Sequence, residues 1–598
     1  MKTLDKRSSI DDKFKWDLSS MISDTNEFNK IKEEIEELTK KMESYKGKIT
    51  SSSNNLVEFL KLDEELDRKV SLIYTWTHML CDSDTTDVES QKLKMQAEKI
   101  NDQISDRLSF VSSEILSNDY DLILKYIDEN SKLEKYRFYF EEMFRYKDHT
   151  LSKEEEQIIT KALNAFGTGD DVFYNLDNAD IKLGLIQDED GNEVELTNSN
   201  YNKFMSSKNR NVRINAFNHL YEFFKNHKNT IAAALKGNIK ENFFLSDVKK
   251  YNSPLEMSLY SDNIDKKVYE NLIEVTHKNL DKMYEYMNIR KKMLGFDELH
   301  MYDIYVDLVD NVNDNIEFEE GKKIVFEALK PLGEEYLKDL EKAFSEKWID
   351  IYPNIGKKSG AYSWGCYDSK PYLLLNYNNT VDSVTTMIHE LGHSMHSYYS
   401  DKKQNYIYHQ YPIFLAEIAS TVNEVLLNDY LYKHAKNKEE KKLYLTEFLD
   451  KIRTTIYRQT MFAEFEMIMH DKEKNNIPLT EQEFSETYYN LNKLYYGNNI
   501  VSDDYIRYEW ARIPHFYSSF YVYKYATGLS SALYIASDIL NGIEGAKEKY
   551  LKFLSSGGSD YPLNILKSVG VDSLKKEPIE KAFKMFEDKL NELKELQS

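Results

Sequence analysis

The scarcity of helix-breaking residues constrains the fold of this chain more than any other feature. Its 598 residues include only 20 Gly and 9 Pro. Because Gly and Pro most often interrupt helices, this composition favours long helices. In residues 26–48 the apolar side chains recur at helical spacing and are separated by charged ones; they are Phe28, Ile31, Ile35, Leu38 and Met42. We therefore predict a mainly α fold.

The clearest sign of β structure lies within residues 180–197. Two short apolar segments flank Asp190-Gly191, a dipeptide that favours hairpin turns. A polar stretch rich in Asn and Ser follows, and a chain of this length exceeds what one hydrophobic core usually organises. We predict an N-terminal helical domain of residues 1–200 that includes this hairpin, and a second domain of residues 201–598.

The charge and the cysteine content exclude several classes of protein. The formal net charge is −23 and the pI is about 5.2, a field that repels phosphate backbones, so no nucleic-acid partner is expected. The two cysteines, Cys81 and Cys366, cannot form a disulfide framework. No apolar segment resembles a signal peptide or approaches the length of a membrane span. We expect a cytoplasmic protein with no membrane partner.

The most informative motif is HELGH at residues 389–393. Histidines four positions apart lie on one face of a helix, where both imidazoles of His389 and His393 can reach one Zn²⁺. Glu390 follows the first ligand and can reach a metal-activated water as a general base without being a ligand. A histidine-rich helix without metal is the alternative interpretation.

The residues before this motif predict that it lies within a helix. Tyr372–Tyr377 has the composition of a strand, and Asn378–Thr380 offers turn and helix-capping side chains. The expected order is therefore strand, turn and helix.

A third ligand is needed, and the nearest carboxylates leave two choices. Asp401 would lie too far along the same helix to reach the metal. The next helix, which begins after Pro412, carries a polar stripe at helical spacing: Glu417, Ser420, Thr421 and Glu424. This stripe faces either solvent or the site, and spacing does not choose between Glu417 and Glu424. His396 is interpreted as a packing residue or a partner of a ligand rather than a ligand itself, and it occupies the position at which metzincins have Gly.

These residues resemble a known family. HELGHSMH, followed by FLAEIASTVNE, is similar to the oligoendopeptidase F branch of the thimet-oligopeptidase (M3) metallopeptidases. Further blocks with this resemblance cover most of the chain; they are KWDLSSM, DHTLSKEEEQII, SKNRNVRINAFNHLYEFFKNHKNTIA, GAYSWGCYDSKPYLLLNY and RIPHFYSSFYVYKYATG.

The resemblance implies a role for each site residue. His389 and His393 would be the imidazole ligands of one Zn²⁺, Glu417 the third ligand and Glu390 the general base. Glu424 then becomes a candidate partner of a ligand.

The resemblance also implies a fold and a substrate class. The expected fold is a multi-helical clamshell with a deep substrate channel and a small β element near the active site, in which residues 201–598 form the catalytic domain. A narrow channel admits short extended peptides and excludes folded domains. The strand with Tyr372 and Tyr377 would then bind substrate by main-chain pairing. We expect a monomeric endopeptidase.

A second block, RIPHFYSSFYVYKYATG at 512–528, resembles the region that stabilises the oxyanion in this family. The best matches are His515 and Tyr523, with Tyr521 as the alternate. Without the resemblance, the block would be a Tyr-rich buried helix.

Two other functions remain open at the level of the sequence. The chain could be a helical peptide-binding or scaffold protein, with a structural metal site closed by His396 or Glu424 as a fourth ligand. It could also be a metal exopeptidase on a related helical fold. Cys366 precedes the expected strand and is interpreted as an inert buried thiol rather than a redox-sensitive one.

Overall fold

The computed structural model describes residues 4–309 and 315–597. The chain divides into two units, each assembled from three separate stretches. Unit 1 comprises Met1–Lys147, Asp314–Tyr430 and Ile535–Gly570, and unit 2 comprises Asp148–Asn313, Leu431–Tyr534 and Val571–Ser598. Residue 200 lies inside unit 2. The division into residues 1–200 and 201–598 stays a prediction, as does the clamshell with its channel, which concerns the arrangement of the two units.

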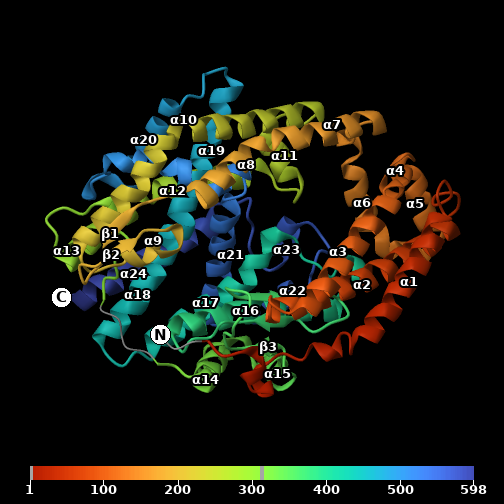
Figure 1. Ribbon diagram of the computed structural model, residues 1–598, viewed down its shortest axis with the longest axis horizontal. Coiled ribbons are helices and arrows are strands. Elements are labelled where there is room, and N and C mark those ends of the chain that lie inside the picture. Colours follow the sequence, from red (N-terminus) through yellow and green to blue (C-terminus); the bar gives the residue numbers. More distant parts are fainter. Residues whose placement is uncertain (1–3, 310–314, 598) are drawn as a thin grey trace. The chain divides into compact units, whose positions relative to one another are not determined.

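Helices make up most of both units, which confirms the prediction of a mainly α fold with small β elements (Figure 1). The helices of unit 1 are α1 (Thr25–Glu43), α2 (Ser53–Ser83), α3 (Val88–Arg107), α4 (Phe110–Leu116), α5 (Tyr120–Glu129), α6 (Arg137–Arg145), α14 (Phe318–Ala328), α15 (Glu334–Ser345), α16 (Val381–Lys403), α17 (Ile413–Lys433), α22 (Ala546–Leu554) and α23 (Pro562–Ser568). The last three residues of α17 belong to unit 2.

Unit 2 contains the longest helix of the described chain, α10. Its helices are α7 (Lys153–Phe166), α8 (Thr168–Asn175), α9 (Asn198–Met205), α10 (Arg210–Val248), α11 (Pro254–Tyr260), α12 (Lys266–Lys278), α13 (Leu280–Leu294), α18 (Lys438–Ile452), α19 (Arg458–Lys474), α20 (Glu481–Tyr496), α21 (Tyr523–Leu540) and α24 (Glu577–Gln597). The end of α21, from Ile535 on, belongs to unit 1.

Local sequence signals correctly predicted the first helix and the hairpin. In α1 the five apolar side chains of the predicted stripe are all buried, and Asp24 caps its first turn. The hairpin pairs β1 (Leu185–Gln187) with β2 (Glu193–Glu195) in antiparallel register, and Gly191 adopts φ +80° in the turn between them.

A three-stranded sheet in unit 1 precedes the helix of the HELGH motif. It consists of β3 (Ile349–Asp350), β4 (Tyr362–Trp364) and β5 (Tyr372–Leu374), in the order β3-β5-β4. β5 pairs in parallel with β3 and antiparallel with β4, and all three of its residues are buried. The central strand is therefore the one predicted at Tyr372–Tyr377, but it is shorter.

The predicted order of strand, turn and helix is confirmed. Thr380 caps α16, since its side chain accepts a hydrogen bond from the Ser383 backbone N–H, and Asp382 lies in the first turn, where a negative charge is favourable. The side chains of Ser363 in β4 and Ser394 in α16 are hydrogen bonded at 2.7 Å, which ties the helix to the sheet.

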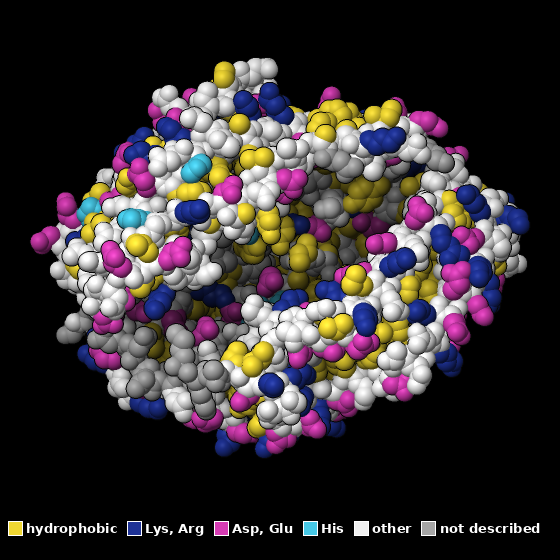
Figure 2. Space-filling view, viewed as in Figure 1, with side chains coloured by type: hydrophobic (Ala, Val, Ile, Leu, Met, Phe, Trp, Pro, Cys, Tyr) yellow, Lys and Arg dark blue, Asp and Glu magenta, His cyan; other side chains and the backbone are white. Residues whose placement is uncertain are grey.

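The surface carries charges of both signs. Acidic and basic side chains are interspersed over the face seen in Figure 2, and the chain has 102 acidic against 79 basic residues. In the described residues, no helix combines the length and apolar character needed to span a membrane.

Candidate metal centre

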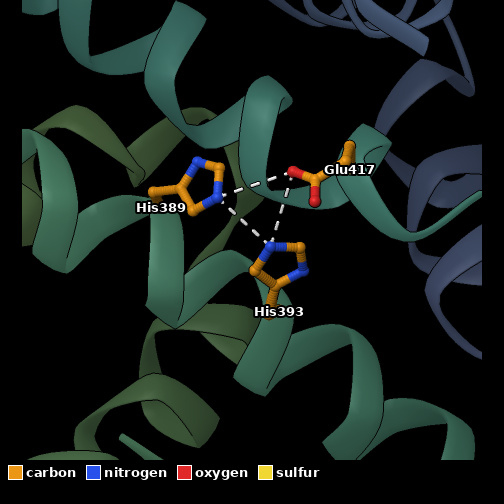
Figure 3. A group of neighbouring side chains, drawn as sticks. All are labelled: His389, His393 and Glu417. Carbon is orange, nitrogen blue, oxygen red and sulfur yellow. Dashed lines mark hydrogen bonds and ion pairs between the residues drawn. The ribbon is translucent and has the colours of Figure 1, made fainter. Parts of the chain in front are cut away.

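Three side chains from two neighbouring helices converge on one point in unit 1. His389 and His393 extend from α16 and Glu417 from α17, and Figure 3 shows their polar atoms pointing toward one another. The Nε2 atoms of the two imidazoles are 3.2 Å apart, and Glu417 Oε2 lies 3.6 Å from each. One ligand atom from each residue lies within 4.8 Å of the others.

This donor set fits a divalent metal ion such as zinc. Two imidazole nitrogens and one carboxylate oxygen are the ligands that zinc takes in catalytic sites. Burial, together with the neighbouring His389, holds the pKa of His393 below its usual range, so that its ring is neutral and has a nitrogen lone pair to offer. Of the two carboxylates that spacing left open, Glu417 is the one whose oxygen lies near both imidazoles.

Glu424 occupies the other side of His389. Its Oε1 lies 2.6 Å from His389 Nδ1. A carboxylate in this position keeps the proton on Nδ1 and leaves Nε2 available on the side of His393 and Glu417. The ring of His393 has a comparable backbone partner, the carbonyl of Ala416. Both imidazoles are thereby oriented by hydrogen bonds as well as by α16.

Glu390 lies beside the cluster and is not part of it. Only 8% of the residue is exposed, and its carboxylate accepts a hydrogen bond from the backbone N–H of Ser363 in β4. Burial raises the pKa of this carboxyl above its usual range, whereas the nearby His389 lowers it. A buried carboxylate with a raised pKa is a better proton acceptor than one in water.

Gly392 allows the two helices to approach closely enough for this geometry. A Cβ atom at this position would lie 2.5 Å from Ser420 Cα and 2.9 Å from the carbonyl oxygen of Ala419, both in the backbone of α17. The amide of Asn423 adds a buried hydrogen bond, 3.1 Å long, to the backbone carbonyl of Ile388 in α16. Glu417 reaches the imidazoles because the backbones of α16 and α17 are nearly in contact.

Replacing Gly392 by Ala is expected to push α17 away from α16. Overpacking of this kind costs about 1–3 kcal/mol of stability, and the displacement of Glu417 should weaken metal binding. Thermal unfolding and a zinc titration measure the two effects. Gly237→Ala, in the exposed part of α10 where nothing lies within 4 Å of the added Cβ, is the matched control. Unchanged unfolding and unchanged metal affinity in Gly392→Ala would contradict the close-packing explanation.

His396 and Cys366 are buried among other side chains. His396 is 1% exposed; its ring is stacked on Tyr411, just ahead of α17, with a centroid distance of 3.6 Å, and packs against Phe553 of α22. The predictions of a packing histidine and of a buried thiol are both confirmed. Burial raises the pKa of Cys366 to about 11, which leaves the thiol protonated and unreactive.

The strand expected to pair with a peptide is the central strand of its sheet. Because β5 is paired on both sides, its backbone offers no edge for a peptide, and the prediction of main-chain pairing at Tyr372–Tyr377 is wrong. The hydroxyl of Tyr372 bonds to Ser20 and that of Tyr377 to the Ile316 carbonyl, so both side chains are held inside unit 1. Neither side chain is placed to bind substrate.

The block at 512–528 lies in unit 2 and is not one helix. Pro514–Tyr517 forms a short 3-10 helix, a loop follows, and α21 begins only at Tyr523. Tyr523 is 0% exposed and packs against Tyr269, so its hydroxyl cannot contact a substrate, and the role predicted for it is wrong. His515 and Tyr525 are half-buried instead, and His515 Nε2 lies 3.2 Å from the Tyr525 hydroxyl. The alternate, Tyr521, is also half-buried, with its ring 6.5 Å from that of His515.

Sequence reasoning missed two residues that this geometry singles out. Tyr525 is one of several tyrosines in its block, and only the start of α21 decides which of them lies beside His515. Gly392 could have been found from the sequence, because Gly is unfavourable in the interior of a helix and therefore indicates a close packing contact.

Comparisons with known proteins place the chain among peptidases. A profile of Peptidase family M3 matches residues 203–585, and one described as Oligopeptidase F matches residues 114–182. Oligopeptidase PepF of Bacillus subtilis is 40% identical over 99% of this chain and 88% of its own length. Group B oligopeptidase PepB of Streptococcus agalactiae is 38% identical over 99% of this chain and 98% of its own length. The crystal structure of oligoendopeptidase-F from Enterococcus faecium aligns with a TM-score of 0.74 at 35% identity and covers 96% of this chain and 99% of its own.

Proposed function

This chain belongs to peptidase family M3, and on that basis we propose that it is a zinc-dependent endopeptidase that hydrolyses internal bonds of short oligopeptides. The observation that carries the proposal is the convergence of His389, His393 and Glu417 on one point beside the buried carboxylate of Glu390. The relatives are named as oligopeptidases, which supports short peptides as the substrate class.

His389, His393 and Glu417 would hold the zinc ion. When bound, zinc acts as a Lewis acid that polarises the scissile carbonyl and makes water more acidic. Glu390 would then take the proton from the attacking water and pass it to the leaving amine. Its burial beside the imidazoles, without being among the three converging groups, supports this division of roles.

We assign the oxyanion role to His515 together with Tyr525. Both are half-buried in unit 2, and His515 Nε2 lies 3.2 Å from the Tyr525 hydroxyl, so an imidazole and a phenol lie side by side as two donors for one oxyanion. Tyr521 remains the alternate. The assignment of this block rests on the family resemblance, and the choice of Tyr525 over Tyr523 rests on exposure.

An open coordination position distinguishes a catalytic site from a structural one. A closed structural site would need a fourth side chain, and the two candidates are His396 and Glu424. His396 stacks on Tyr411, and the Oε1 of Glu424 is hydrogen bonded to the far nitrogen of His389. Among the residues the structure describes, three ligands converge, which favours an enzyme over a scaffold.

The edge strand β4 is the best candidate for pairing with the peptide backbone. It lies at the edge of the three-stranded sheet, and its Ser363 N–H bonds to the Glu390 carboxylate. A peptide added to this edge would therefore run past the proposed base. We further propose that the enzyme is a cytoplasmic monomer whose narrow channel admits short peptides.

A quenched fluorescent peptide with both termini blocked tests the proposed activity. We expect purified protein to cleave it internally, as shown by mass analysis of the products, because an endopeptidase needs no free terminus. Failure to cut the blocked peptide combined with cleavage of the unblocked one would replace this proposal with an exopeptidase. Failure to cut either would favour the scaffold.

A further inference from the structure

We propose that Glu466 is a positioning residue, whose carboxyl group fixes the loop that connects the short helix of His515 to the helix of Tyr525 by binding the backbone of Phe520. The inference rests on the proposed function, since it concerns the oxyanion donors. All residues involved lie in unit 2.

Phe520 marks the point at which the loop needs support. Its φ is +60°, in the left-handed region that bulky residues avoid, and its ring is 1% exposed. The backbone N–H of Phe520 donates to Glu466 Oε1 at 2.9 Å, and the ring packs 4.5 Å from that of His470. Glu466 and His470 are one turn apart on α19, so this helix holds both the backbone and the side chain of Phe520.

A second set of contacts holds the same loop from α10 and α11. The amide of Asn242 donates to Ser519 Oγ at 2.6 Å, and the amide of Asn238 donates to the Tyr517 carbonyl at 3.2 Å. The hydroxyl of Ser258 donates to the Ser519 carbonyl at 3.2 Å. Tyr517, Ser519 and Phe520 are thus tied to α10, α11 and α19, between His515 on one side and Tyr525 on the other.

The chemistry of Glu466 indicates that it acts as a neutral acceptor rather than as a charge. It is 3% exposed, and among the described residues its Oε1 accepts from the Phe520 N–H while its Oε2 has no hydrogen-bond partner. Burial raises the pKa of its carboxyl to about 8, and burial also lowers the pKa of His470 to about 4. Near neutral pH both groups are therefore mostly uncharged, and an amide at position 466 could accept the same hydrogen bond.

Such a loop matters because the placement of donors decides how well they stabilise a transition state. Donors must be preorganised near the position that the oxyanion will occupy, and small displacements are costly. A carboxyl that holds a strained backbone five residues from His515 and five from Tyr525 can control both at once.

The test compares Glu466→Leu, which removes the acceptor, with Glu466→Gln, which keeps one. We expect Glu466→Leu to lower kcat by about 10–100-fold with KM changed less than about twofold, in line with the loss of oriented oxyanion donors. Glu466→Gln should stay within about threefold of the parent. Metal content should be unchanged in both, because the proposed ligands lie in unit 1.

Glu464→Leu is the matched control. Glu464 is a buried carboxylate on the same helix, but it contacts His277 and Tyr495 rather than the loop. The Glu464→Leu variant should have a lower melting temperature than the parent and an unchanged kcat. If Glu466→Leu does not fold, Ser519→Ala, which removes the contact with Asn242, should still lower kcat by several-fold at constant KM; an unchanged kcat in Ser519→Ala would overturn the proposal.

A double variant separates this inference from the proposed function. If Glu466 acts through Tyr525, the double variant Glu466→Leu/Tyr525→Phe should lose much less kcat than the product of the fold-losses in the two single variants. Three results would each overturn the positioning role. The first is a parent-like kcat in Glu466→Leu, and the second is an equal loss of kcat in Glu466→Gln and Glu466→Leu. The third is a double variant whose loss of kcat equals the product of the two single losses. If instead His515→Ala and Tyr525→Phe keep full activity, the oxyanion assignment itself fails, whatever Glu466 does.

Discussion

Replacing Glu390 by Gln is expected to lower kcat by about 10³-fold or more while the metal stays bound. General acid–base catalysis contributes about 10²–10⁴-fold, and an amide cannot accept the proton of the attacking water. Gln has nearly the same shape as Glu and can still accept the hydrogen bond from Ser363. Metal binding should persist because Glu390 is not among the three converging ligands.

Steady-state rates on a quenched peptide and metal analysis of the same preparation check this expectation. Asp382→Asn is the matched control, since Asp382 is an exposed carboxylate on the same helix and one turn or more from the cluster. It should leave both the rate and the metal content unchanged. A Glu390→Gln protein that retains the parental rate would remove Glu390 from the mechanism and revive the scaffold interpretation.

The second large effect is expected from Glu417→Ala. This change removes the anionic member of the donor set and leaves only the two imidazoles, so the affinity for zinc should fall by more than about 100-fold and activity should be lost with it. Glu417 is 49% exposed at its side chain, so its removal leaves no buried cavity. The loss should therefore appear in a zinc titration rather than in the stability of the folded chain.

Glu424→Ala provides the comparison within the same helix. Glu424 contacts His389 Nδ1 and not the converging point, and the loss of such a partner typically costs about 10–100-fold in metal affinity or activity. Glu417→Ala should be the more damaging of the two. The reverse order would mean that Glu424 is the ligand and Glu417 its partner.

Local patterns in the sequence predicted the elements that local interactions determine. The stripe from Phe28 to Met42 is the buried face of α1, and Asp190-Gly191 forms the hairpin turn. The His389–His393 pair follows from helical geometry alone. In each case the relevant residues lie within a few positions of one another, so that their spacing carries the information.

The spacing of residues along the sequence does not predict interactions between separate helices and strands. Glu417 and Glu424 lie on one face of α17, and only the packing of α17 on α16 through Gly392 decides which of them faces both imidazoles. The pairing of β5 on both sides depends on β3, which comes more than twenty residues earlier.

The error at Tyr523 has a related cause. It lies two residues from Tyr525, and at the start of α21 this spacing turns the two side chains in different directions, one inward and one toward the surface. The start of that helix depends on the loop held by Glu466, and thus on contacts with α19 that lie more than fifty residues earlier in the chain. The family resemblance indicates the block, and the structure shows which of its tyrosines are buried.

Metal content measured together with activity tests the central claim most directly. We predict that the purified protein binds one zinc ion per chain, that a chelator removes both the ion and the cleavage of a blocked peptide, and that one equivalent of zinc restores the cleavage. Metal-free protein that cleaves the peptide at an undiminished rate, or protein that takes up no ion at all, would contradict it.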